Sequence, residues 1–255
     1  MSFKIFDSFC GIGRWAKRDI ITPSTVDEVV AQLDRFGISR ALVYSNRIRQ
    51  LSQADECNQT LVEMINNNER LIPAFSLALN PYEADNGVDS CFGLMRDAKA
   101  RALWINSPFA SKKLTHSLRR WQLGEWLDRC SKAKLPVLLY AEGLPPDNID
   151  TLCREFPDLK VILTSVMYSG DSFLYPLLRA HPNLYVSLGH MYIPAGNPEL
   201  FVRHHGYKRL IFGSGLPDFS PGGMITHVMY ADISDTAKSA IFSDNLATLL
   251  NEVEL

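Results

Sequence analysis

Residues 135–143 read "LPVLLYAEG", and this stretch carries the pattern that decides the fold. A run of apolar residues ends in an aromatic residue and then in polar ones, with no alternation along the run. Near-continuous apolar runs are typical of parallel strands that helices bury on both faces. The stretch therefore predicts a buried parallel strand over 136–140, with polar side chains at its carboxyl end.

Similar runs recur along the chain, and stretches of helical periodicity separate them. The predicted strands cover 3–6, 41–44, 71–77, 102–105, 136–140, 160–164, 184–188 and 209–213. The predicted helices cover 25–36, 53–67, 86–97, 118–133, 148–156, 172–180, 197–205 and 235–251. Eight strands, each followed by a helix, in 255 residues predict a (β/α)8 TIM barrel.

A doubly wound open sheet is the main alternative, because it shows the same alternation of strands and helices. No G-x-G-x-x-G motif follows the first predicted strand, which disfavours the dinucleotide-binding version of that fold. The chain has no internal repeat and no long linker. We therefore expect one domain over residues 1–255, with a first helix that begins at a capping box of Thr25 and Glu28.

Composition and charge exclude several classes of partner. The formal net charge is -2 and 46% of the residues are hydrophobic, so neither nucleic acid nor an anionic membrane is an expected partner. No apolar run is long enough to span a bilayer, and no apolar leader is visible. The 5 cysteines form no C-x-x-C pair, which favours reduced, buried thiols and a cytoplasmic location.

The candidate catalytic residues follow from the barrel, because TIM barrels place working residues at the carboxyl ends of their strands. Tyr140 and Glu142 follow the strand at 136–140, and His190 follows the strand at 184–188. We expect Glu142 to carry a proton and Tyr140 or His190 to stabilise negative charge. The alternatives are an ion pair of Glu142 with Arg47 or Arg49, space filling by Tyr140, and a purely structural hydrogen bond from His190.

Other polar or aromatic residues at the predicted strand ends are candidates for substrate binding. Arg47 could clamp a carboxylate or phosphate, although a surface position is the plainer interpretation. Asp218 could either reach the mouth or cap a segment after Pro221. Cys10 is interpreted as a small buried side chain rather than a nucleophile. The predicted substrate-binding residues are Phe9, Arg47, Asn106, Ser165 and Asp218.

Four stretches resemble the amidohydrolase superfamily, in its amidohydrolase-related (family 2) branch. They are "FDSFCGIG" (6–13), "LPVLLYAEG" (135–143), "FPDLKVILTSV" (156–166) and "KRLIFGSGLP" (208–217). The resemblance implies a TIM barrel of the metal-dependent hydrolase kind. It also implies a metal held by two histidines after strand one, single histidines after strands five and six, and an aspartate after strand eight.

This chain departs from the implied metal ligands at every position. The corresponding residues are Phe9, Gly11, Tyr140, Ser165 and Gly215. Phenylalanine, glycine and serine are not useful zinc ligands, and tyrosine rarely is one. We therefore predict no metal and no cofactor. A new site built from Cys10, Glu142, His190 and Asp218 is disfavoured, because these residues lack the short spacing of known metal motifs.

Three interpretations of function stay open, and the sequence leaves it undecided whether the protein is an enzyme. The first is a metal-independent hydrolase or C–C lyase acting on a small polar substrate, derived from a carboxylate or a sugar. The second is a non-catalytic protein that binds a small molecule. The third is a pseudoenzyme that serves as a scaffold or forms a homo-oligomer. Convergence of Glu142 and His190 favours the first, and packing of Phe9 against Tyr140 favours the third.

Overall fold

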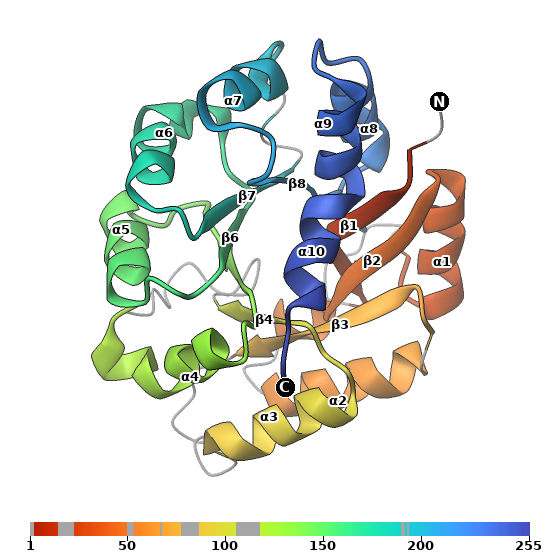
Figure 1. Ribbon diagram of the computed structural model, residues 1–255. Helices are drawn as coiled ribbons and strands as arrows, with labels where there is room; N and C mark the ends of the chain where they lie inside the picture. Colours follow the sequence, from red (N-terminus) through yellow and green to blue (C-terminus); the bar gives the residue numbers. More distant parts are fainter. Residues whose placement is uncertain are drawn as a thin grey trace.

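The computed structural model describes residues 3–14, 23–49, 54–66, 68–77, 87–105, 118–189, 192 and 194–255. Eight parallel strands pair in chain order, from β1 to β8, and helices surround them (Figure 1). The (β/α)8 TIM barrel is thus confirmed. The strands are β1 (Ile5–Ile12), β2 (Ile38–Ser45), β3 (Leu71–Leu77), β4 (Ala102–Ile105), β5 (Val137–Tyr140), β6 (Val161–Thr164), β7 (Leu184–Leu188) and β8 (Leu210–Phe212).

The helices alternate with these strands and cover the outside of the barrel (Figure 1). Three further helices follow β8 at the end of the chain. The α-helices are α1 (Val26–Arg35), α2 (Ala54–Ile65), α3 (Gly87–Asp97), α4 (Arg120–Lys132), α5 (Pro146–Glu155), α6 (Asp171–Ala180), α7 (Asn197–His205), α8 (Pro221–Met229), α9 (Asp235–Ser239) and α10 (Asn245–Asn251). Short helical segments are η1 (Asn46–Arg49), η3 (Tyr168–Gly170) and η4 (Ala240–Asp244).

The chain closes the barrel by joining β1 to the segment that follows β8. The amide of Gly11 donates to the carbonyl of Leu216 at 2.8 Å. The amide of Gly215 donates to the carbonyl of Phe9 at 3.0 Å. The buried carboxylate of Asp7 accepts hydrogen bonds from the Ser214 amide at 2.8 Å and from the Ser214 hydroxyl. These contacts exclude the open sheet, because such a sheet leaves its first and last strands unpaired.

The first strand is longer than predicted, because it runs through Asp7 to Ile12. A register shift lies between Asp7 and Cys10, after which pairing with β2 continues as far as Ile12 and Ser45. Such irregularities bend a strand without ending it. Asp7 therefore lies within the strand, and the predicted end of this strand at residue 6 was wrong.

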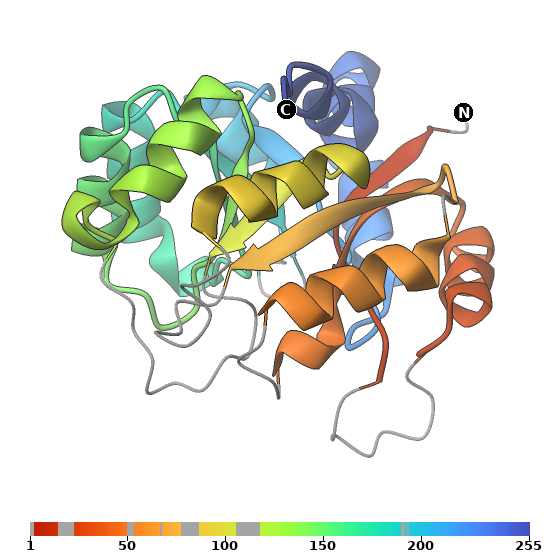
Figure 2. The ribbon, with the colours of Figure 1, turned by 90° about the horizontal axis from the view of Figure 1, so that it is seen from below.

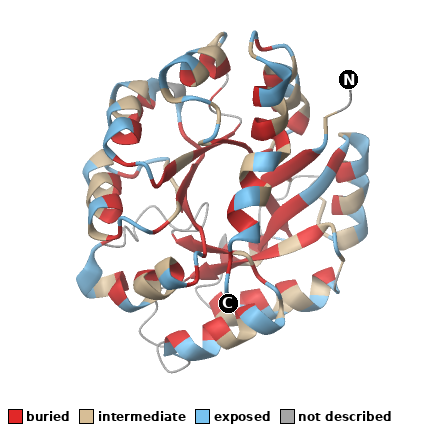
Figure 3. Cartoon of the chain, viewed as in Figure 1, coloured by how far each residue is buried: buried red, intermediate tan, exposed pale blue. Residues whose placement is uncertain are grey.

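Two apolar cores result from the alternation of side chains along the strands. On β5, Val137 and Leu139 pack against the helices, while Leu138 and Tyr140 belong to the cluster inside the barrel. Helix α10 lies across the end of the barrel where the strands begin, with the C-terminus beside it (Figures 1 and 2). Its Leu246 and Leu249 join the interior cluster. Figure 3 shows the strands as almost entirely buried.

Local sequence signals explain most helix boundaries. The predicted capping box of α1 is confirmed, since the Glu28 amide donates to the Thr25 hydroxyl and the Glu28 carboxylate accepts from the Thr25 amide. Helix α8 was not predicted, because Gly222 and Gly223 are poor helix formers. Burial of Met224 stabilises it instead. Among the described residues, we find no helix with the length and apolar character needed to cross a bilayer.

Candidate functional site at the carboxyl end of the barrel

Tyr140 and Glu142 form the polar centre of the described part of this end. The Tyr140 hydroxyl donates to the Glu142 carboxylate, with 2.5 Å between the two oxygens. Tyr140 is half-buried at the end of β5, and Glu142 is exposed in the loop that follows. Burial raises the pKa of Tyr140, and the hydrogen bond and charge of Glu142 raise it further. The phenol therefore stays protonated at neutral pH and can donate a hydrogen bond.

Ser165 lies beside this pair, directly after β6. Its backbone has a φ of 51°, a left-handed conformation that is uncommon outside glycine. The hydroxyl is buried and lowers the pKa of Tyr140 in part, yet it forms no hydrogen bond of ordinary geometry with a described residue. Uncommon backbone conformations and unpaired buried polar groups both concentrate at functional sites. Both features are consistent with the predicted role of Ser165 in substrate binding, which stays a prediction.

Three aromatic rings occupy the interior of the barrel next to Tyr140. The ring centroids of Phe9 and Trp104 are 5.2 Å apart, those of Phe9 and Tyr44 are 5.7 Å apart, and those of Tyr44 and Trp104 are 5.3 Å apart. All three side chains are buried, and Tyr140 packs against the same cluster. We call Phe9, Tyr44 and Trp104 the ring cluster. It fills the interior of the barrel beside Tyr140 with aromatic side chains.

The residues at the metal positions that the resemblance implies do not fit a metal. The Phe9 ring belongs to the ring cluster, so apolar atoms fill the place of one ligand. A Cβ atom at Gly11 would come within 2.3 Å of the Asn46 side-chain oxygen, so no larger side chain fits there unless Asn46 moves. Gly215 has a φ of 72° and offers no side chain. A divalent metal needs several converging N, O or S donors, and these positions do not supply them.

A metal centre of different composition is also not visible in the described part of the chain. No three His, Cys, Asp or Glu side chains gather there as metal ligands would. Cys10 is completely buried, and burial together with the charge of Asp7 raises the pKa of its thiol. A thiolate is the reactive form, so Cys10 acts as a small core side chain, as expected.

The other predicted site residues have mixed outcomes. Arg47 is held by helix α2, since its guanidinium lies 3.1 Å from the Glu56 carboxylate and 3.2 Å from the Thr60 hydroxyl. It forms no ion pair with Glu142. The N-cap of α8 is Ser220 and not Asp218, so the capping role proposed for Asp218 is wrong. Asn106 and His190 lie outside the described residues, and their roles stay predictions.

Sequence reasoning missed a second tyrosine–carboxylate pair at this end. The Tyr192 hydroxyl donates to Asp171 at 2.9 Å, and burial raises the pKa of both groups. Tyr192 was visible as a residue after strand seven, but nothing in the sequence marked Asp171, the first residue of α6. The ring-cluster members Tyr44 and Trp104 were missed as well, although each lies at or near the end of a predicted strand.

Comparison with known proteins gives a fold and no family assignment by sequence. No family profile matches the chain, and no curated protein matches it. Solved structures do match it over nearly its whole length. They include a dihydroxybenzoic acid decarboxylase from Polaromonas, with bound manganese and the inhibitor 2-nitroresorcinol. That match has a TM-score of 0.77 and 12% identity over 98% of this chain and 97% of the other.

Two further structures extend the comparison to other reactions. A 5-carboxyvanillate decarboxylase from Sphingomonas paucimobilis matches with a TM-score of 0.70 and 12% identity, over 98% of this chain and 99% of the other. A candidate 2-pyrone-4,6-dicarboxylic acid hydrolase from Pseudomonas putida matches with a TM-score of 0.73 and 16% identity, over 99% of both chains. At such identities the likeness shows the fold alone, a (β/α)8 barrel that this chain shares with two decarboxylases and a candidate hydrolase.

Proposed function

We propose that the protein is a hydrolase or C–C lyase that acts on a small aromatic carboxylate at the carboxyl end of the barrel. The observation that carries this proposal is the short hydrogen bond between Tyr140 and Glu142, directly beside the ring cluster. A proton donor and a carboxylate next to a cluster of aromatic side chains are suited to an aromatic acid. A sugar-derived substrate, which has little flat apolar surface, is less well suited.

In this proposal Glu142 carries the proton and Tyr140 binds the substrate. Because the pKa of Tyr140 is raised, its hydroxyl remains a donor that can hydrogen-bond a substrate oxygen. In a decarboxylation the bond between the ring carbon and the carboxylate breaks, and carbon dioxide leaves with no net charge. The ring carbon takes its proton from Glu142, which enters the step protonated and regains a proton from water. In a hydrolysis Glu142 would instead accept a proton from the attacking water. Ser165 and His190 are the proposed further contacts.

The structural neighbours support the choice of substrate class. Their names give dihydroxybenzoic acid, 5-carboxyvanillate and a pyrone dicarboxylic acid, all of them flat rings with carboxylate groups. For this protein we propose only this class of substrate, and not a particular compound. We also propose that the reaction does not use a metal at the position that the resemblance implies, since Phe9, Gly11 and Gly215 provide no donor there.

The proposal is tested by turnover of 2,6-dihydroxybenzoate and 5-carboxyvanillate, measured with and without a chelator. We expect turnover that the chelator does not change. Glu142→Gln should lower kcat by about 10²–10⁴, the usual contribution of a general acid or base. Glu125→Gln is the matched control, because Glu125 is exposed on α4 outside the site. Loss of turnover when the chelator is added would refute the proposal that the reaction does not use a metal.

A pseudoenzyme is the alternative, and the ring cluster is the observation that favours it. Close packing of Phe9 with Tyr44 and Trp104 leaves these rings buried, which is also how a barrel would fill a disused site. Calorimetry with the same two acids separates the cases. Binding without turnover would indicate a non-catalytic binding protein, and neither binding nor turnover would indicate a scaffold.

A further inference from the structure

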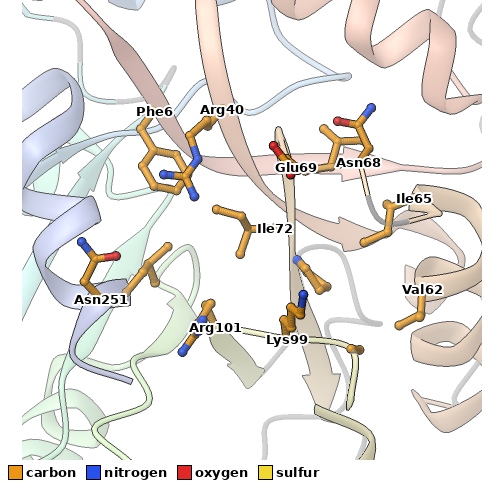
Figure 4. Close-up of a pocket in the computed structure, with 14 residues that line it drawn as sticks. Phe6, Arg40, Val62, Ile65, Asn68, Glu69, Ile72, Lys99, Arg101 and Asn251 are labelled. Atoms are coloured by element: carbon orange, nitrogen blue, oxygen red, sulfur yellow. The ribbon is translucent and has the colours of Figure 1, made fainter. Parts of the chain in front are cut away.

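A cavity of about 410 Å³ opens at the other end of the barrel, where the strands begin. It lies among the starts of β2, β3 and β4, the end of α2, and α10 (Figure 4). Tyr140, by contrast, is the last residue of β5 and lies at the opposite end of the barrel. A volume of this size falls in the range of pockets that hold small molecules. The site proposed above does not use any of its residues.

The rim of this cavity carries an excess of positive charge. Arg40 lies on one side of Ile72, and Lys99 and Arg101 lie on the other (Figure 4). Glu69 is the carboxylate that lines the same cavity. Three cations around one pocket stand out in a chain whose formal net charge is -2.

These cations are available to a ligand. In the part of the chain that the structure describes, neither Arg40 nor Lys99 forms an ion pair, and both are exposed. Arg101 donates to the carbonyl of Val253 at 2.9 Å, which fixes its guanidinium and leaves further N–H groups. Cations held near one another repel, so an anion bound between them is favoured.

The floor of the cavity is apolar. The Phe6 ring is buried, and the guanidinium of Arg40 lies 4.8 Å from the centre of this ring. This stacking holds the planar guanidinium in place, where it can bind a phosphate or carboxylate through two parallel N–H groups. Ile72 and Leu250 line the same cavity. A flat apolar group fits this floor while its charge contacts the rim.

We propose that this cavity binds a small organic dianion with a flat apolar body, such as an aryl phosphate or an aryl dicarboxylate. Arg40 contacts the anion from one side, and Lys99 and Arg101 contact it from the other. Because the lining comes from both the strand starts and α10, the bound ligand joins the C-terminal helix to the barrel. The protein is therefore stabilised when the ligand binds.

Phenyl phosphate is the probe, used at pH 8 and low ionic strength, where it is a dianion because its second pKa is about 6. Calorimetry on the full chain should give a saturable site with a Kd below about 1 mM, and the melting temperature should rise with probe concentration. Inorganic phosphate should bind at least about tenfold more weakly, since it lacks the apolar body. Equal binding of the two would refute the proposed class of ligand.

The double variant Arg40→Gln/Lys99→Gln should weaken phenyl phosphate binding by at least about tenfold. Arg35→Gln is the matched control, because Arg35 lies 5.5 Å over the Phe36 ring in a similar stacking but does not line the cavity. Unchanged binding by the double variant, or no saturable binding by the parent, would overturn the proposal. Should the double variant not fold, Lys99→Gln alone is the test, with an expected loss of about threefold to tenfold.

Discussion

The carboxylate of Asp7 is the residue on which closure of the barrel depends most directly. It accepts the amides of Phe9 and Ser214 and the hydroxyl of Ser214, and it is completely buried. Burial raises its pKa, while these hydrogen bonds lower it in part. A group that is costly to bury is retained here because it satisfies donors from both ends of the chain.

Removal of this acceptor should therefore destabilise the protein strongly. Asp7→Ala leaves the buried amides of Phe9 and Ser214 without this acceptor and leaves the Ser214 hydroxyl only its longer contact with the Phe9 carbonyl as acceptor. We expect a loss of about 2–5 kcal/mol in the free energy of unfolding. Asp7→Asn keeps one carbonyl oxygen, so its loss should be clearly smaller. Urea unfolding monitored by circular dichroism measures both. Equal stability of the alanine variant and the parent would contradict the role given to Asp7.

Single residues of the site were predictable only in part. Tyr140, Glu142 and Ser165 could be located from the sequence, because the carboxyl end of each predicted strand gives their position. That Asn46 occupies the space beside Gly11 could not be predicted, since it depends on how two separate strands approach. For the same reason the sequence did not reveal the pairing of Asp171 with Tyr192.

Among the elements, α10 is the helix that seals the amino end of the barrel. Its first residue, Asn245, donates to the carbonyls of Tyr207 and Leu210 at 2.7 and 2.8 Å, which fixes the helix beside β8. Leu246 and Leu249 then fill the end of the interior. The helix is therefore part of the core. Its loss would expose the interior cluster at the end of the barrel where the strands begin.

Leu246→Ala should lower the free energy of unfolding by about 2–5 kcal/mol, because it removes buried methyl groups and leaves a cavity. Leu200→Ala is the comparison, since Leu200 is 39% exposed on α7, and we expect a change within about 0.5 kcal/mol. Thermal and urea unfolding measure the two. A similar small loss for both variants would mean that α10 does not pack as described.

The elements were easier to predict than their ends. Apolar runs such as Val137–Tyr140 identify buried strands well, because only a strand that is buried on both faces has apolar side chains at successive positions. The extension of β1 beyond Asp7 was missed, since a strand with a polar residue and a register shift has no regular pattern. Helix α8 was missed because Gly222 and Gly223 oppose helix formation locally, and only tertiary burial compensates.

At the scale of the whole molecule, the reactivity of the cysteine thiols indicates how tightly the barrel is packed. All 5 are free and buried, and burial raises the pKa of Cys91 and of Cys153 to about 12. At neutral pH such thiols carry almost no thiolate, and the reagent must also reach them.

We therefore expect slow reaction of the native protein with a disulfide reagent such as dithiobis(nitrobenzoate) at pH 7. In guanidinium chloride the same assay should count 5 thiols quickly. Leu200→Cys adds a thiol at an exposed position of α7, and this thiol should react at least about tenfold faster than the native ones. Rapid labelling of a native cysteine would show that the surrounding helices open readily.

Closure through Asp7 and Ser214 has a consequence for how the chain reaches its folded state. The two partners are separated by 207 positions, so the final strand pairing forms only when almost all of the barrel is already assembled. Contacts of such high sequence separation slow folding, because a long loop must close before they form. During synthesis one edge of the first strand therefore remains unpaired until residue 214 has emerged from the ribosome. A chaperone that shields unpaired strand edges would act mainly within this interval.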